Sequence, residues 1–498
     1  TYSAANITGD IVAVWSLSGM DGYAEMTSYD DTSCVVKKIA ETTTLVQGTL
    51  SCTLKRRYNN SSLFTVSKNI ELINESIAES DAGIVTSLYN AGLCANPAYI
   101  TKEEAALITP VDLQPGTSYS GGIFYSQRSN VKSFDGFKYF TGVTHLNPYT
   151  VYGWSNCTSM TLPTSLTEVA DSNFNGMNIS IRLDISHIKV IGQSCFTKVT
   201  LGDIVVNSCG HYSFQSCNID SVTCAAAEAK NIFGECTIGT IKSLEGMEVM
   251  SGAFYGAQIL DRKVPLPSTL TTWEASNSGY NPFSNYSNKR CIADFTLPES
   301  NPYFKTEEGI LYSKDGKTLR CLNKDIDYLE ISNVDTIARG SINGSINKLK
   351  ISAKTIESNA SPGSFLGTSL VFAEGVESID YRAFGDCSNL QEITFPSTLK
   401  TIGSENFTRI SVPIPEVVIP EGCTSVMNAF NYSYIDRIVF PSTLTGRFYL
   451  SAYCKEVVVH PECTITELSV TSQFLTSIPN IPPTCKTVDI RDILGIES

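Results

Sequence analysis

Apolar and polar residues alternate along this chain over short runs, a pattern typical of half-buried β-strands rather than of helices. Near the N-terminus it predicts four strands separated by Gly, Asp and Asn turns, at residues 11–17, 34–39, 44–54 and 63–67. A helix is expected at residues 80–89, with Ser80 as the N-cap and Asp81 in the first turn, because a Ser side chain accepts a hydrogen bond from a free N–H group at a helix start.

Farther along the chain the apolar pattern repeats. Aromatic residues recur at intervals of 18 to 22 residues, at Trp154, Phe174, Phe196, Phe214, Phe233 and Phe254, and then of 19 to 23 residues, at Phe365, Phe384, Phe407 and Phe430. A second marker is an apolar-Pro-x-x-apolar turn, which begins at Leu162, Leu266, Phe395 and Phe440. A period near 22 residues predicts a solenoid, because one such unit cannot bury its apolar side until its neighbours stack on it.

One unit of the repeat, residues 383–403 (AFGDCSNLQEITFPSTLKTIG), closely resembles the BspA-like leucine-rich repeats. Residues 133–144 look like the entry unit of such an array. Residues 301–319 resemble the family's hairpin insertion, with Asp315 and Gly316 as a type I′ turn. Residues 99–108 are similar to the helical cap that often precedes the array, and Thr101 and Glu104 there form a capping box.

The resemblance implies a mainly β fold: a leucine-rich-repeat solenoid preceded by a short helical cap and a small β-rich N-terminal module. The expected domains are an anchoring or assembly module at residues 1–80, the cap and a linker at 81–127, and the solenoid at 128–490. The hairpin insertion lies near residues 300–320 of that solenoid.

The cysteines fit one position of the repeat. Three residues after the aromatic marker stand Cys157, Cys217, Cys236 and Cys387, and other units carry Val, Met, Ala, Thr or Ile at the same place. A position that accepts these residues requires a small or medium apolar group, so we interpret these cysteines as reduced core residues rather than as disulfide partners.

Composition excludes some partners. The chain has 36 basic and 50 acidic residues, a net charge of −14, and only 17% charged residues in total. Binding to nucleic acid or to an anionic membrane needs a positive field, so neither is expected. No apolar run approaches the length of roughly 20 residues needed for a membrane span.

Catalytic and metal-binding motifs are weak. The four histidines, His145, His187, His211 and His460, lie at least 24 residues apart, and each of three has one neighbouring Asp or Cys. We therefore predict no enzyme, no cofactor and no metal site. His460 precedes Pro461 at the place where other repeats carry Phe395, Ile419 or Phe440, which favours a packing role at a strand end.

A candidate interaction stripe follows from aligning four strands on the prolines that end them, at positions 396, 420, 441 and 461. Four residues before these prolines are Glu392, Glu416, Arg437 and Val457, and two residues before them are Thr394, Val418, Val439 and Val459. A Thr-Val-Val-Val row on one face either fills the strands with ordinary β-branched residues or contacts a partner or a second copy of the chain.

The resemblance implies recognition of a protein or glycan on a cell surface, as in adhesins of gut anaerobic bacteria and of the phages that infect them. Two versions stay open: a phage virion component such as a head or tail fibre, and a secreted or cell-surface bacterial adhesin. The unpaired cysteines and the absence of signal, lipid or sorting motifs favour the virion surface. Contacts of the N-terminal module with other virion proteins, and formation of a homo-oligomer, are also left open.

Overall fold

The computed structural model describes residues 2–3, 9–39, 46–72, 77, 81–114, 120–178, 180–274, 281–283 and 291–491. The chain forms two compact units, Thr1–Glu168 and Val169–Ser498. Strands dominate both, which confirms the mainly β fold class.

The first unit begins with two antiparallel sheets. Their strands are β1 (Tyr2–Ser3), β2 (Ile11–Ser18), β3 (Ala24–Tyr29), β4 (Ser33–Lys38), β5 (Val46–Arg56) and β6 (Ser62–Leu72). The strand orders are β1-β4-β3 and β2-β5-β6, and a small core that includes Trp15, Cys34 and Leu50 lies between the sheets. All four predicted strands are present, although residues 44 and 45 of the third lie outside the described residues. Strand β3 was not predicted, because Met26 is its only large aliphatic residue and Ala24 and Glu25 are depleted in strands.

Short helices follow: α1 (Ala82–Asn90), α2 (Lys102–Leu107), α3 (Pro110–Leu113), η1 (Tyr125–Gln127) and η2 (Asp135–Tyr139). Helix α1 is capped by Asp81, whose carboxylate accepts a hydrogen bond from Gly83 N–H at 2.8 Å. The N-cap is therefore Asp81, and Ser80 lies outside the described residues. The predicted capping box is confirmed, because Thr101 Oγ1 accepts from Glu104 N–H and Glu104 Oε2 accepts from Thr101 N–H.

Around these helices the first unit holds an aromatic core. Five fully buried rings make edge-on and stacked contacts with one another: Phe124, Phe134, Phe137, Phe140 and Trp154. The short strands here are β7 (Ser133–Phe134), β8 (His145–Leu146) and β9 (Ser159–Met160), and β7 pairs with β9 in parallel. Strand β10 (Glu168–Val169) lies at the boundary of the two units.

The second unit is a stack of parallel coils. Its strands are β11 (Arg182–Leu183), β12 (Val190–Ile191), β13 (Phe196–Thr197), β14 (Thr200–Val206), β15 (Phe214–Gln215), β16 (Asn218–Cys224), β17 (Glu228–Lys230), β18 (Thr237–Ser243), β19 (Val249–Ser251), β20 (Gln258–Ile259), β21 (Lys263–Pro265), β22 (Thr272–Glu274), β23 (Asp294–Thr296), β24 (Phe304–Glu307), β25 (Ile310–Ser313), β26 (Thr318–Ile337), β27 (Ile342–Ile356), β28 (Ser361–Ser364), β29 (Ser369–Phe372), β30 (Ser378–Ile379), β31 (Phe384–Asp386), β32 (Glu392–Thr394), β33 (Thr401–Ile402), β34 (Ile414–Val418), β35 (Ser425–Val426), β36 (Tyr434–Phe440), β37 (Thr445–Ser451), β38 (Tyr453–Val459), β39 (Thr464–Thr471) and β40 (Thr487–Arg491).

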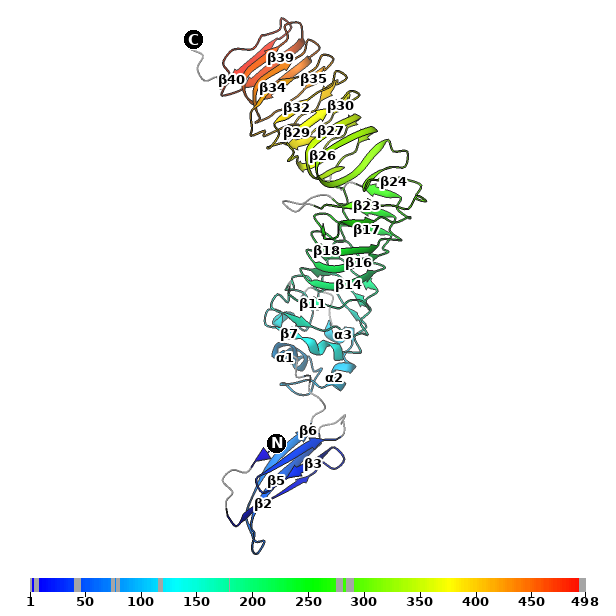
Figure 1. The fold of residues 1–498 in the computed structure, drawn as a ribbon. Helices are drawn as coiled ribbons and strands as arrows, with labels where there is room; N and C mark the ends of the chain where they lie inside the picture. The colour runs from blue at the N-terminus through cyan, green and yellow to red at the C-terminus, as the bar shows by residue number, and fades with distance from the viewer. Residues whose placement is uncertain are drawn as a thin grey trace. The chain divides into compact units, whose positions relative to one another are not determined.

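Successive coils of this unit pair their strands in parallel. One sheet has the order β11-β14-β16-β18-β20, and another has the order β34-β36-β38 (Figure 1). The region at residues 175–260, whose repeats diverge from the consensus, forms coils as regular as the others. Stacking requires that each coil place apolar side chains at its inward positions, and these coils meet that requirement without the consensus residues.

The recurring aromatic residues form the interior of the stack. Phe174, Phe196, Phe214, Phe233, Phe254 and Phe283 are fully buried, with successive ring centroids 4.6 to 5.4 Å apart. The position three residues later is also internal, and Cys217, Cys236 and Cys387 there are fully buried. None of the sixteen cysteines is bonded to another, and thirteen are buried, which agrees with a core position for them. Their reduced state stays a prediction.

The Pro-Ser-Thr turns bind each coil to the one before it. In three coils a Ser donates hydrogen bonds from N–H and Oγ to a Glu carboxylate of the preceding coil: Ser268 to Glu245, Ser397 to Glu374 and Ser442 to Glu421. The next residue, Thr398 in the middle case, accepts from Gly375 N–H at 3.0 Å and donates to Val376 C=O at 2.9 Å. The repeated motif therefore satisfies backbone groups that the turn would otherwise leave unpaired.

The hairpin insertion is present, but its type I′ turn is at another position. Strands β24 and β25 are joined by Glu308 and Gly309, which both have positive φ, as a type I′ turn requires. At the predicted site only Gly316 has a positive φ, and its N–H donates to Ser313 C=O. Asp315 instead accepts from Ser313 Oγ and Lys317 N–H, so the β25–β26 connection is a different turn.

Candidate binding surfaces

Four of the eight residues of the predicted stripe, Glu416, Val418, Arg437 and Val439, lie on the outward face of sheet β34-β36-β38. In the parallel register Glu416 pairs with Arg437 and Val418 with Val439, and β38 continues these two rows with Glu456 and Val458. Val418 is 51% exposed, whereas the alternate residue Val417 is buried. The outward face therefore carries one charged row and one valine row.

Two residues of the predicted stripe are wrong. Val457 and Val459 pair with Ile438 and Phe440, and they are only 3% and 0% exposed. Their side chains belong to the core, and Glu456 and Val458 take the places on the stripe.

The error arises from the position of one proline. In the other coils the C=O of the aligned proline accepts a hydrogen bond from the residue three positions on, as Pro441 does from Leu444. In the last of these coils His460 C=O accepts from Cys463 instead, so His460 takes the position of Pro441, and Pro461 comes one residue later. Because side chains alternate between faces, a shift of one residue exchanges the inside and the outside.

His460 is consequently not a packing residue at the strand end. It is half-buried at the turn, and its Nδ1 accepts a hydrogen bond from Glu462 N–H at 3.3 Å. The correct register of β36 and β38 could have been found from the sequence by aligning the charged pair Asp436-Arg437 with the charged pair Lys455-Glu456.

The remaining two residues of the predicted stripe lie in another sheet. Glu392 and Thr394 are exposed on β32, which pairs with β29, opposite Ser369 and Val371. Ser369 Oγ donates to Glu392 Oε2 at 2.8 Å. The register thus brings together the residues of β34, β36 and β38 and leaves those of β32 in a separate ladder.

The charged row pairs with itself. Arg437 forms an ion pair with Glu416 on one side, and its Nε lies 3.1 Å from Glu456 Oε2 on the other. The pKa of Arg437 is raised above its usual value, and the largest cause is its hydrogen bond to Glu416. Beside this row Lys455 Nζ lies 2.7 Å from Asp436 Oδ1. These charges are therefore compensated within the sheet.

An aromatic cluster, which sequence reasoning missed, borders the same sheet. Tyr434 and Tyr453, paired at the start of β36 and β38, stack with ring centroids 4.6 Å apart. Phe474 lies 6.1 Å and 6.0 Å from these two centroids and is 45% exposed. Exposed Tyr and Phe side chains are enriched where proteins meet partners.

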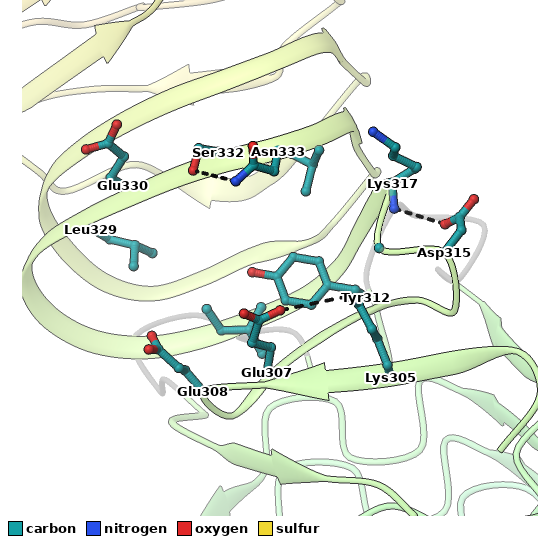
Figure 2. Close-up of a pocket in the computed structure, with 13 residues that line it drawn as sticks. Lys305, Glu307, Glu308, Tyr312, Asp315, Lys317, Leu329, Glu330, Ser332 and Asn333 are labelled. Atoms are coloured by element: carbon teal, nitrogen blue, oxygen red, sulfur yellow. Dashed lines mark hydrogen bonds and ion pairs between the residues drawn. The ribbon is translucent and has the colours of Figure 1, made fainter. Parts of the chain in front are cut away.

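A pocket of about 430 Å³ lies between the hairpin insertion and β26. Figure 2 shows Lys305, Glu307 and Glu308 of the hairpin on one side and residues of β26 on the other, with the Tyr312 ring between them. Burial, followed by the charges of Glu307 and Glu308, raises the pKa of Tyr312.

The charges around this pocket pair locally. Lys305 Nζ lies 3.8 Å from Glu307 Oε2, and Lys350 Nζ lies 2.9 Å from Glu330 Oε1. The lining therefore contains side chains of both charges, with four acidic and two basic residues.

Within the described part of the chain, no three His, Cys, Asp or Glu side chains are grouped closely enough to hold a metal ion. His145, His187 and His460 are half-buried and His211 is exposed. Among the described helices none has the length and apolarity to cross a membrane.

Comparison with solved structures returned other repeat proteins. A leucine-rich cell surface protein from Faecalibacterium prausnitzii A2-165 shares 17% identity, with a TM-score of 0.38, over 72% of this chain and 83% of its own. The pneumococcal vaccine antigen PcpA shares 17% identity, with a TM-score of 0.34, over 70% and 72%. A leucine-rich repeat protein from Bacteroides ovatus ATCC 8483 shares 14% identity, with a TM-score of 0.36, over 68% and 88%. No curated protein sequence matches the chain.

The family comparison agrees with the coils themselves. The model for the BspA-type leucine-rich repeat region matches six copies, at residues 122–237 and 332–476, which together make up just over half of the chain. These residues include four of the stacked rings, from Phe174 to Phe233, the Pro-Ser-Thr turn at residues 396–398 and the sheet β34-β36-β38 described above. The chain therefore belongs to the BspA-type leucine-rich-repeat family.

Proposed function

We propose that this chain is a non-enzymatic adhesive protein, displayed on the outer surface of a particle or cell, which binds protein or glycan on another surface. The observation that carries the proposal is the outward face of β34-β36-β38. There a valine row, exposed at Val418 and half-buried at Val439 and Val458, and the exposed ring of Phe474 flank charges that are already compensated.

The composition of this face supports binding rather than simple solvation. Protein interfaces bury a central apolar and aromatic patch inside a polar rim. Tyr and Arg are frequent among the hot-spot residues, which contribute most of the binding free energy. Two neighbouring strands, β34 and β36, provide these residue types, at Val418, Tyr434, Arg437 and Val439. The face is also rigid, because its inward side chains belong to one continuous core.

The domain assignment belongs to the same proposal. Residues 1–80 anchor or assemble the protein, residues 81–127 cap the array, and residues 128–490 display it. For the carrier we favour a phage virion, as a head or tail fibre component, with a secreted or cell-surface bacterial adhesin as the second candidate. The sixteen free cysteines support the virion, because virion proteins assemble in a reducing cytosol and disulfides form mainly in oxidising compartments.

Adhesion is tested by measuring how much labelled chain binds to intact cells of the microbial community in which the protein is produced. Saturable binding is expected. Loss of binding after protease treatment of the cells identifies a protein receptor, and loss after periodate oxidation identifies a glycan. Binding that does not saturate, or that survives both treatments, contradicts the proposal.

The carrier is tested separately by density-gradient fractionation of a producing culture, followed by detection of the chain with an antibody. Sedimentation with phage particles supports the virion assignment. Recovery with the bacterial envelope or in the secreted fraction contradicts it and supports the bacterial adhesin, without affecting the test of adhesion.

A further inference from the structure

The N-terminal module ends in an edge strand with unusual exposure. Strand β6 pairs with β5 and with no other described strand, so among the described residues it is an edge of its sheet. Residues 62–69 are all exposed. A long open edge with apolar side chains is a template for pairing with another strand, and most proteins protect such edges with charges, prolines or a covering element. The exposed stretch of β6 carries one charge, Lys68, and no proline.

The apolar side chains on this strand point toward the core side of the sheet but are not covered. Phe64 pairs with Leu54 and Val66 with Cys52, and both partners pack against the module's core. Phe64 and Val66 are nevertheless 55% and 60% exposed, whereas Ile70 on the same face is 9% exposed. The core thus covers one end of β6 and leaves the Phe64 end open.

The opposite face of β6 is polar and internally paired. Thr65 Oγ1 lies 2.8 Å from Thr53 Oγ1, and Ser67 Oγ lies 2.8 Å from Ser51 Oγ. An additional strand beside β6 would therefore continue a sheet that already has one apolar and one polar face.

We propose that the open edge of β6 pairs with β6 of a second copy of this chain, antiparallel and centred on Val66, to give a two-fold symmetric dimer. The proposal is independent of the adhesive function, because it concerns the N-terminal module and not the repeats. A symmetric antiparallel pair places a residue opposite the one equally far from the centre, and both then point to the same face.

The order of side chains along β6 supports a dimer centred on Val66. Val66 meets Val66 of the second copy, which is a favourable β-branched pair, and Phe64 meets Lys68, which places an ammonium group near an aromatic ring. Thr65 meets Ser67, so hydroxyl groups face each other on the polar side. A dimer centred on Lys68 would oppose like charges, which destabilises a strand pair.

The dimer has a direct test in solution with the full-length chain. Sedimentation equilibrium is expected to show concentration-dependent association from 54.1 kDa toward twice that mass. Phe64→Lys should leave the chain at 54.1 kDa at every concentration. Val14→Lys is the matched control, because Val14 is 42% exposed on the polar face of β2, the other edge strand of the same sheet, and the dimer should survive.

Cross-linking tests the register without depending on the loss of a contact. Val66→Cys places two thiols opposite each other across the two-fold axis, and mild oxidation should give a reducible dimer. Asn69→Cys, which is roughly 20 Å from its symmetry mate at about 3.3 Å per residue, should give none. A wild-type chain that stays monomeric at high concentration, or equal cross-linking by both variants, overturns the proposal.

Discussion

Val439 on β36 lies directly opposite Val458 on β38, and not opposite Val459, which is fully buried. This pairing separates surface from core in the last coils of the solenoid. We predict that Val439→Asp and Val458→Asp weaken adhesion while the thermal unfolding midpoint changes little.

Val459→Asp is the contrasting variant. It buries a carboxylate with no partner, which costs several kcal/mol or more, so the chain should unfold at a much lower temperature. Circular dichroism and cell binding measured on the three variants provide the comparison. If Val459→Asp folds normally and Val439→Asp does not, the assignment of inside and outside is wrong.

Cys387 occupies a fully buried position that other repeats fill with Val, and burial raises its pKa. We expect Cys387→Val to change the free energy of unfolding by less than about 1.5 kcal/mol, as volume-conserving apolar substitutions do. Cys387→Ser should cost about 1–3 kcal/mol, because a buried hydroxyl loses its water partners. Chemical denaturation measures both, and equal stability of the two variants would contradict a packing role.

The reactivity of the cysteines provides a second test. Burial raises the pKa of Cys157 to about 11 and that of Cys195 to about 12, so these two thiols are scarcely ionised at pH 8, whereas a hydrogen bond from Cys224 lowers the pKa of the half-buried Cys209. Titration of the native protein with a thiol reagent should therefore be slow at Cys157 and Cys195 and faster at Cys209, and it should recover sixteen thiols in denaturant. Recovery of only a few in denaturant without reductant would show that most are disulfide-bonded.

Glu374 and Glu421 should make folding sensitive to acid. Hydrogen bonds from the backbone N–H of Ser397 and Ser442 lower the pKa of these carboxyls below the ordinary value of 4.5. As the pH falls, these carboxylates are protonated at a higher pH in the unfolded chain than in the folded chain. The stabilisation that their hydrogen bonds provide is therefore complete above pH 4.5 and is lost as the pH falls through the lower pKa values of the folded state.

The experiment is thermal unfolding between pH 6 and pH 3 for the wild type and for Ser397→Ala, which removes only the Oγ donor to Glu374. We expect the variant to lose less stability on acidification than the wild type does. A steeper acid dependence in the variant would contradict the role of this contact.

Asn406 holds three backbone groups in a fully buried position. Its Nδ2 donates to Asp380 C=O and Gly403 C=O, each at 2.8 Å, and its Oδ1 accepts from Phe384 N–H at 3.0 Å. Each group left unpaired costs about 1–3 kcal/mol, so Asn406→Ala should lower the unfolding midpoint strongly. Asn480→Ala, at an exposed residue, is the control and should leave the midpoint unchanged.

Much of the repeat could be predicted from the sequence, because stacking constrains the same positions in every coil. The recurring aromatics, the interchangeable cysteine position and the Thr101–Glu104 capping box follow from local spacing, and the structure places them as expected. Type I′ geometry at Glu308 and Gly309 could not be told from Asp315 and Gly316, because both dipeptides contain a Gly that tolerates positive φ.

The sequence by itself determined which side chains share a face of a strand, because alternation is a property of the extended backbone. Only the tertiary structure decided which face is covered. Val459 and Val439 look equivalent along the chain, but the turn at His460 shifts one of them into the core. In the same way Phe64 and Ile70 lie on one face of β6, and only the extent of the opposing sheet decides that Phe64 remains exposed.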